Sequence, residues 1–133
     1  MPNKGRLSES SVQLLKQAGL EIEDSDDRKL FAAVKKRDFA VMFVRAQDIV
    51  NFVNKGAVDV GITGKDLLLE AGLDVETLHE LNFGHCRIAV AAPDNSGIDK
   101  VEDVPNGAVV ATSFPNVARK YFEKAGRRVE ITV

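Results

Sequence analysis

Residues 39–44 read Phe-Ala-Val-Met-Phe-Val, and residues 58–63 read Val-Asp-Val-Gly-Ile-Thr. The first run is apolar without a break, which is typical of a strand buried on both faces of a parallel sheet. Between the two runs, residues 46–55 carry apolar side chains at helical spacing, and Gly56 then ends the predicted helix. We therefore predict a right-handed βαβ unit whose strands at 39–44 and 58–63 are adjacent, parallel and buried.

The same alternation of strand and helix patterns extends along the chain and predicts an α/β fold with parallel or mixed sheets. A helix is expected at 7–18, with Ser8 as its N-cap and Gly19 at its end. Short strands are expected at 29–34 and 87–92, and a helix at 63–71. A second βαβ unit follows, with strands at 108–113 and 128–133 and a helix at 115–125. The apolar stripe of that helix is expected to be Val117, Ala118, Tyr121, Phe122 and Ala125.

The polar break at residues 93–97 divides the chain into two predicted lobes, residues 1–92 and residues 93–133. The chain has 133 residues with 18 Lys and Arg against 20 Asp and Glu, a formal charge of −2. This balance argues against a protein that binds nucleic acid through bulk charge. No apolar run approaches the roughly 18 residues of a membrane span, and no signal-peptide pattern opens the chain. A cytoplasmic, soluble protein is expected.

Polar and charged residues follow the predicted strands, where ligands bind in open α/β sheets. Arg45 and Asp48 follow the strand at 39–44, and Gly64, Lys65 and Asp66 follow the strand at 58–63. Separately, Lys4, Gly5 and Arg6 lead directly into the first helix, where backbone N–H groups and the helix dipole favour phosphate. From these residues we predict an anion-binding α/β protein.

Several of these residues also have a purely structural interpretation. Thr63 and Asp66 have the spacing of a capping box, so Asp66 is as readily a helix cap as a ligand. Arg28 lies in a charged stretch where a solvated side chain is the simpler interpretation. Cys86, the single cysteine, is expected to be a small core residue, and the histidines are too isolated for a metal site. A P-loop is excluded, because Asp59 and Asp66 stand where that motif needs Gly and Ser or Thr.

Taken in order and spacing, six segments resemble ATP phosphoribosyltransferase, the enzyme of the first step of histidine biosynthesis. The block at 56–66, Gly-Ala-Val-Asp-Val-Gly-Ile-Thr-Gly-Lys-Asp, is the most specific. The resemblance covers essentially the whole chain. The other segments are Pro-Asn-Lys-Gly-Arg-Leu-Ser-Glu at 2–9, Asp-Arg-Lys-Leu at 27–30, Val-Arg-Ala-Gln-Asp-Ile at 44–49, Leu-Asn-Phe-Gly-His-Cys-Arg at 81–87 and Ala-Thr-Ser-Phe-Pro-Asn-Val-Ala-Arg at 111–119.

The resemblance implies a two-lobed fold similar to the type II periplasmic binding proteins, with substrates in the cleft. It implies that N1 of ATP attacks C1′ of phosphoribosyl pyrophosphate, with pyrophosphate leaving and Mg²⁺ assisting. Arg6 and Arg28 match arginines on the pyrophosphate side, while Arg45 and Asp66 match residues on the ATP or product side. Lys4 and Gly64 are included on the ATP or product side. A homo-oligomer is expected, with a regulatory subunit if the parent enzyme is the short form.

The resemblance also implies a leading strand before residue 2 and, after residue 133, a loop of Gly, Asp and Thr that holds the 5-phosphate. We therefore expect a core that is truncated at both ends, with an incomplete second lobe and no activity by itself. The alternative is a non-enzymatic small-ligand-binding or interaction module on the same fold, or an engineered lobe.

Overall fold

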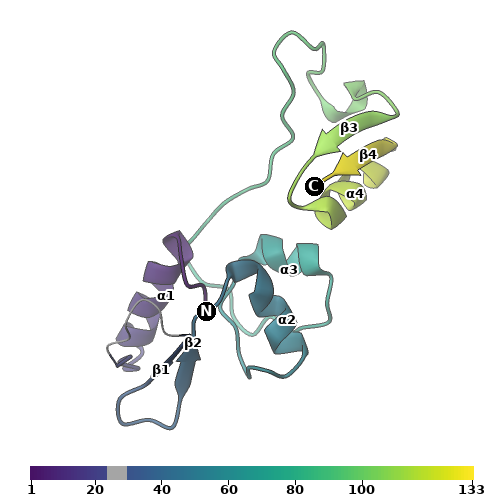
Figure 1. The fold of residues 1–133 in the computed structure, drawn as a ribbon. Coiled ribbons are helices and arrows are strands. Elements are labelled where there is room, and N and C mark those ends of the chain that lie inside the picture. The colour runs from purple at the N-terminus through teal and green to yellow at the C-terminus, as the bar shows by residue number, and fades with distance from the viewer. Residues whose placement is uncertain (24–29) are drawn as a thin grey trace. The chain divides into compact units, whose positions relative to one another are not determined.

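The computed structural model describes residues 1–23 and 30–133 of a mixed α/β chain (Figure 1). The chain divides into two compact units. The first contains Met1–Leu68 and Leu73–His85, and the second contains Leu69–Gly72 and Cys86–Val133. The division into catalytic lobes at residues 92 and 93 stays a prediction.

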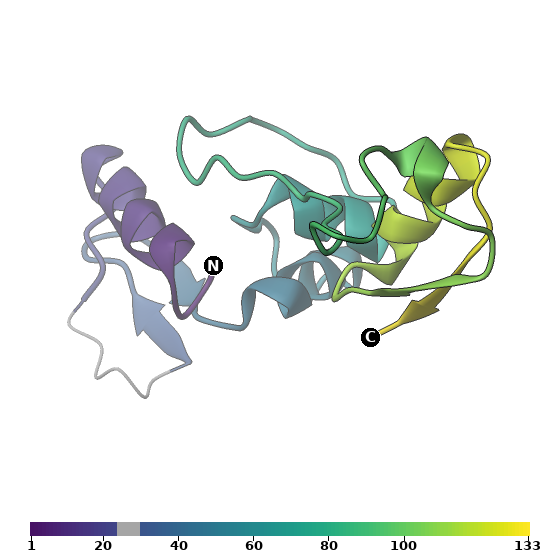
Figure 2. The same cartoon turned by 90° about the horizontal axis from the view of Figure 1, so that it is seen from above.

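The first unit contains a small sheet built around a hairpin. Strand β1 (Phe31–Ala33) pairs antiparallel with β2 (Ala40–Met42), with Ala32 opposite Val41. Isolated bridges extend the pairing at both sides, since Ile22 pairs antiparallel with Val34 and Pro2 pairs parallel with Val44. The first residues of the chain therefore run alongside the end of β2 before the first helix begins (Figures 1 and 2).

The predicted βαβ unit around residues 39–63 is wrong. Strand β2 pairs with β1 in a hairpin, Phe39 is 62% exposed, and residues 58–63 form no strand. The physical reason is that the hairpin strand β2 and the residues just after it already have hydrogen-bonding partners on both edges. One edge of β2 is taken by β1, and at the other edge Val44 exchanges hydrogen bonds with Met1 and Asn3. A strand at 58–63 has no free edge there to join.

The helices of the first unit follow the predicted pattern more closely. They are α1 (Arg6–Gln17), the 3₁₀ turn η1 (Ala46–Asp48) that runs into α2 (Ile49–Asn54), and the start of α3 (Lys65–Ala71), whose residues from Leu69 onward belong to the second unit. Ser8 is not the N-cap of α1, because Gly5 takes that position and its carbonyl accepts the Ser8 N–H at 3.0 Å. The predicted end is confirmed: Gly19 has φ of 78°, and its N–H donates to the Lys16 carbonyl while Leu20 N–H donates to Leu15.

The buried part of α2 explains how residues 58–63 are held without strand pairing. Ile49 and Val50 are 2% and 1% exposed. A Cβ atom added to Gly61 would lie 2.6 Å from Cγ2 of Ile49 and 2.9 Å from Cγ2 of Val53, so the backbone at Gly61 rests directly on the helix. Only a residue without a side chain allows this close approach.

The second βαβ unit is confirmed. Strands β3 (Ala108–Ala111) and β4 (Val129–Thr132) pair in parallel, and α4 (Pro115–Lys124) connects them and packs against β4 (Figure 2). A short 3₁₀ turn, η2 (Val101–Asp103), precedes β3. Phe122 is 2% exposed, but Tyr121 is 47% exposed and so does not belong to the buried stripe predicted for this helix.

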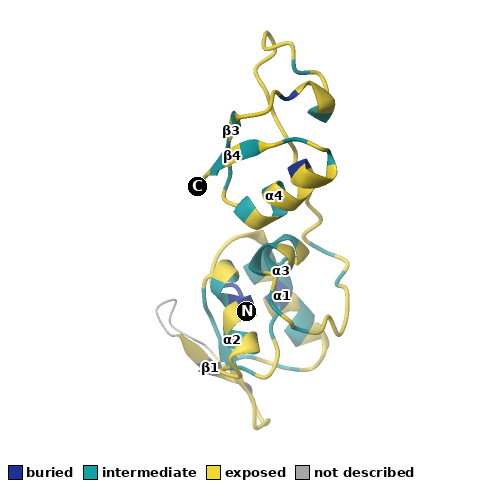
Figure 3. Ribbon diagram, turned by 90° about the vertical axis from the view of Figure 1, so that its right-hand side faces the viewer, coloured by how far each residue is buried: buried dark blue, intermediate teal, exposed yellow. Residues whose placement is uncertain are grey.

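The strand predicted at residues 87–92 is absent from the described structure. This stretch is extended and exposed (Figure 3), with Ile88 48% and Val90 52% exposed. Its alternation of apolar residues is sufficient for a strand, but within residues 1–23 and 30–133 no other segment pairs with it. Cys86 lies next to it and is exposed rather than buried. None of the described helices is long and apolar enough to cross a membrane.

Replacing Phe122 tests how far the second unit depends on the contact between α4 and its sheet. We expect Phe122→Ala to lower the free energy of unfolding by about 3–5 kcal/mol, because it removes a fully buried aromatic side chain and leaves a cavity. Tyr121 is the single tyrosine of a chain without tryptophan, and the Tyr121 ring packs edge-on against Phe122. Tyrosine fluorescence during urea unfolding therefore reports on this unit. The control is Val109→Ala, at a position 67% exposed, which should change stability by less than about 0.5 kcal/mol. Equal effects would contradict the packing described.

Candidate functional site

The turn before α1 is fixed in place by hydrogen bonds to the segment that follows β2. Asn3 N–H donates to the Val44 carbonyl at 2.9 Å, and Val44 N–H donates to Met1 at 3.0 Å. The N-terminal ammonium adds a bond to the Met42 carbonyl at 2.7 Å, and its burial lowers the pKa of this group. These bonds join the turn that carries the exposed residues Lys4 and Arg6 to Val44, the residue before Arg45.

The N-terminus of α1 is open. Its N-cap, Gly5, has φ of 82° and provides no side-chain cap. Within the described residues, no group accepts a hydrogen bond from the N–H of Arg6 or Leu7. Two donors at the positive end of a 12-residue helix, next to the side chains of Lys4 and Arg6, form an arrangement that suits an anion.

Arg45 is the N-cap residue of η1, and its side chain makes a single described contact. Its Nε donates to Oδ2 of Asp48 at 2.9 Å, while the side chain remains 72% exposed. Exposed pairs at this spacing contribute little to stability, typically a few tenths of a kcal/mol. The pair instead orients the guanidinium, whose Nη groups have no partner among the described residues and remain able to bind a ligand.

A hydrogen bond also ties the loop before α3 to the Arg45 segment. The Thr63 hydroxyl donates to the Ala46 carbonyl at 3.3 Å. The capping-box interpretation of Asp66 is wrong, because α3 begins at Lys65 and its first intrahelical carbonyl is that of Gly64, which accepts the Leu68 N–H at 3.1 Å. Asp66 therefore sits one position too early for the box, and its carboxylate lies against Gly64 instead.

The structure thus joins three segments that carry predicted site residues. They are the turn with Lys4 and Arg6, the start of η1 with Arg45, and the loop with Gly64 and Asp66, all in the first unit. Arg28 lies outside the described residues. Whether Arg45 and Asp66 converge on one cleft stays a prediction.

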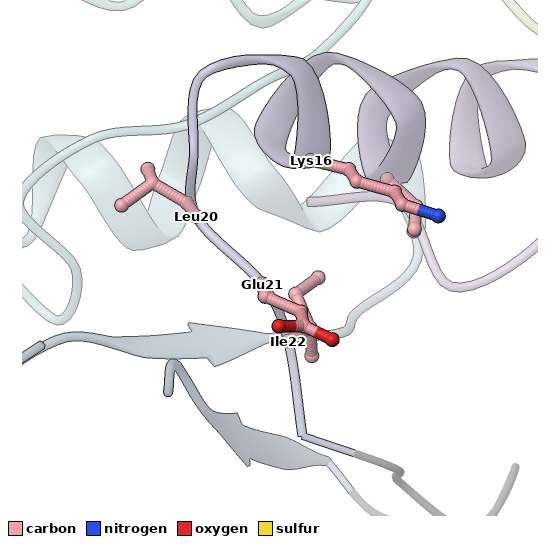
Figure 4. A pocket seen from close by; sticks show the side chains of 5 residues that line it. Lys16, Leu20, Glu21 and Ile22 are labelled. Atoms are coloured by element: carbon pink, nitrogen blue, oxygen red, sulfur yellow. The ribbon is translucent and has the colours of Figure 1, made fainter. Parts of the chain in front are cut away.

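A shallow hollow lies elsewhere in the first unit, between the end of α1 and residues 21–23 (Figure 4). It is lined by Val12, Lys16, Leu20, Glu21 and Ile22. Its volume of about 170 Å³ is below the roughly 300–1,000 Å³ of ordinary ligand pockets. It contains none of the predicted site residues, so the candidate site remains the three joined segments.

Two carboxylates, Glu70 within α3 and Glu80 after it, were not identified from the sequence. Glu80 accepts a hydrogen bond from Lys65 Nζ at 2.6 Å, and this bond, with the Lys65 charge, lowers the pKa of the Glu80 carboxyl. Glu70 contacts the start of α4. The partners lie 15 and 46 residues apart in the sequence, and no local pattern links residues at such separations.

Comparison with known proteins identifies the family of the chain. The family model "HisG: ATP phosphoribosyltransferase" matches residues 45–133, well over half of the chain. The chain belongs to the HisG family. The ATP phosphoribosyltransferases of Methanothermobacter thermautotrophicus and Methanopyrus kandleri are 45% and 47% identical to it over 131 residues. Each alignment covers 98% of this chain and 46% of the relative, so the chain spans about half the length of these HisG proteins.

A solved structure gives the same result for the fold. The chain is similar to one in the ATP phosphoribosyl transferase (HisG:HisZ) complex from Thermotoga maritima, with a TM-score of 0.79 and 28% identity. This similarity covers 98% of the chain and 61% of the HisG-complex chain. The resemblance found in the six sequence segments is therefore confirmed at the level of family.

The bond between Thr63 and Ala46 can be tested by removing the hydroxyl. We expect Thr63→Val to lower the free energy of unfolding by about 1 kcal/mol, because the Ala46 carbonyl loses a donor. Thr63→Ser keeps the hydroxyl and should restore most of the loss. Urea unfolding followed by circular dichroism measures both variants. If Thr63→Val and Thr63→Ser had the same free energy of unfolding, the hydroxyl would have no role in joining the two loops.

The Lys65–Glu80 pair predicts a pH effect with a definite sign. Because the pKa of Glu80 is lowered in the folded chain, the pair contributes above the ordinary carboxyl pKa of 4.5 and is lost as the pH falls through the lowered value. We expect the Glu80 carboxyl, followed by NMR, to titrate at a higher pH in Lys65→Met than in the unchanged chain. The same midpoint in both proteins would contradict the contact.

Proposed function

We propose that this chain works in the condensation of ATP with phosphoribosyl pyrophosphate, which gives N1-(5-phosphoribosyl)-ATP and pyrophosphate and begins histidine biosynthesis. Family membership supports the reaction, and the open N-terminus of α1 supports the binding of a phosphate or pyrophosphate group. The single observation that carries the proposal is the joining of that N-terminus to the Arg45 segment by the Asn3–Val44 hydrogen bond. ATP and phosphoribosyl pyrophosphate are cytoplasmic metabolites, which supports a cytoplasmic location.

The reaction requires positive groups that are in place before charge develops. As C1′ becomes cationic, the departing pyrophosphate gains negative charge, and fixed donors aimed at it lower the barrier. We assign Arg6, with the Arg6 and Leu7 N–H groups, to the pyrophosphate, and we carry Arg28 over to the same side from the family resemblance. Arg6 is exposed and unpaired among the described residues, so it can bind a ligand without first breaking an ion pair.

The nucleotide side is assigned to the other two segments. Arg45 can direct its Nη groups to a phosphate of ATP, since Asp48 occupies only Nε. Asp66 can accept hydrogen bonds from a sugar or base, and Lys4 adds positive charge at the shared edge. Gly64 keeps the backbone accessible, because a side chain there would overlap the Asp66 carboxylate.

Mg²⁺ is proposed to arrive with phosphoribosyl pyrophosphate. Within residues 1–23 and 30–133, no three His, Cys, Asp or Glu residues are grouped to hold a metal ion. The described residues therefore do not fit a resident metal site. Mg²⁺ usually binds through substrate phosphates, water and one or two carboxylates, which is compatible with a metal carried by the substrate.

The fuller fold and the assembly are proposals as well. We propose that the fold is the two-lobed, periplasmic-binding-protein-like one, which the two compact units support. We also propose a homo-oligomer. A regulatory subunit is supported by the similarity to the Thermotoga maritima assembly, which is a complex of HisG with HisZ.

A second candidate function, nucleotide binding without transfer, is favoured by the exposed guanidinium of Arg45, whose Nη groups have no partner among the described residues. The 133 residues align with 46% of the length of each of two HisG relatives. Orientation of the ribosyl donor supplies a large part of the barrier reduction in such a reaction. We therefore expect the 133 residues alone to bind ATP and to form no N1-(5-phosphoribosyl)-ATP above background in a chromatographic assay.

Calorimetric titration with ATP tests the assignment of Arg45. We expect Arg45→Ala to weaken binding roughly 10- to 100-fold, because one charged hydrogen bond to phosphate contributes about 1.5–3 kcal/mol. Arg45→Lys should lie between the two, since it keeps the charge but loses the fork. The control is Arg119→Ala, at an exposed position on α4. Unchanged affinity in a folded Arg45→Ala protein would remove Arg45 from the site.

A further inference from the structure

Helix α4 begins without a cap from its own sequence. Its N-cap residue is Phe114, which offers no side-chain hydrogen bond, and Pro115 in the first helical position has no N–H. The Phe114 N–H donates to Oγ1 of Thr112 at 3.0 Å, and the Ala118 N–H donates to the Phe114 carbonyl at 2.9 Å. The N–H groups of Asn116 and Val117 are the two that remain to be satisfied.

Both remaining donors are satisfied by one carboxylate. Oε1 of Glu70 accepts the Asn116 N–H at 2.9 Å, and Oε2 accepts the Val117 N–H at 2.9 Å. The Asn116 side chain also donates, from Nδ2 to the Glu70 carbonyl at 3.0 Å. The backbone and the carboxylate of Glu70 are therefore both held, and all three residues belong to the second unit. With this contact, every N–H in the first turn of α4 has an acceptor.

The N-terminus of α4 is a position at which a phosphate group of a ligand would ordinarily bind. It lies where a strand of a parallel pair gives way to a helix, and phosphates in α/β proteins bind at such helix N-termini beyond the carboxyl ends of strands. Here a carboxylate occupies the place, with two oxygens on two N–H groups as a phosphate would have. We propose that Glu70 is an internal anion that closes the N-terminus of α4 to phosphate groups.

The contrast with α1 shows why closure matters. Both helices begin without a side-chain cap, but the first N–H groups of α1 have no acceptor among the described residues, and cationic side chains lie beside them. A phosphate near α4 would have to displace Glu70 and break two charge-assisted hydrogen bonds. Glu70 therefore directs phosphates away from α4. These contacts are made within the chain and are independent of the proposed reaction.

The test uses the ¹⁵N-labelled 133-residue chain, titrated with inorganic phosphate and with pyrophosphate. In the unchanged protein we expect the Asn116 and Val117 amide signals to stay in place. In Glu70→Ala we expect both signals to shift on adding either anion and both amides to exchange with solvent about tenfold faster or more, because each loses a charged acceptor. Glu123→Ala, which removes an exposed carboxylate from the same helix, should behave like the unchanged protein.

Several outcomes would overturn the proposal. One is a phosphate-dependent shift of both amides in the unchanged protein, since the site would then be open despite Glu70. Another is faster exchange in Glu70→Ala without any response to phosphate, which would make Glu70 a helix cap only. If Glu70→Ala does not fold, Glu70→Gln keeps the size of the side chain but can accept only one of the two N–H groups. It should then show faster exchange at one amide and a weaker response to phosphate, and no change at either amide would equally contradict the proposal.

Discussion

The parallel pairing of the first three residues with the end of β2 is the constraint on which the first unit depends. It uses the free edge of the hairpin, which is why residues 58–63 pack on α2 through Gly61 instead of pairing as a strand. It also sets where α1 begins, because the chain leaves the bridge at Pro2, turns at Gly5 and enters the helix at Arg6. The positions of Lys4 and Arg6 relative to Arg45 follow from this one pairing.

The N-termini of α1 and α4 differ in whether their backbone N–H groups have acceptors. The start of α1 keeps its donors free among the described residues and is flanked by cations, whereas the start of α4 is completed by the carboxylate of Glu70. The difference does not come from helix length or from local caps, since neither helix has a side-chain cap of its own. It comes from which distant side chain the fold brings to each end. In a chain of the HisG family, whose relatives are named for acting on ATP, the free end is the one suited to phosphate.

Much of the helical structure could be predicted, because it depends on neighbours in the sequence. The ends at Gly19, Gly56 and Gly126 are formed by residues within six positions of each other, and the positive φ of these glycines satisfies the last carbonyls locally. The residues of the candidate site were selected from the sequence because they are charged and stand at the starts of helices, and their roles stay a prediction. The predictions of strands at 58–63 and 87–92 were wrong, because an apolar run indicates only that a segment is able to pair. Whether a partner edge is available is decided by distant parts of the chain.

The amino-acid sequence alone was enough to determine the family, the C-terminal helix ends at Gly19, Gly56 and Gly126, and the parallel βαβ unit of β3, α4 and β4. All of these depend on short-range spacing, or on motifs whose order along the chain is specific. It took the folded chain to establish that β2 belongs to a hairpin, that Thr63 bonds to Ala46 rather than capping α3, and that Glu70 completes α4. The physical reason is that a hydrogen-bonding group takes whichever partner the fold brings within about 3 Å, and sequence separation carries no information about that partner.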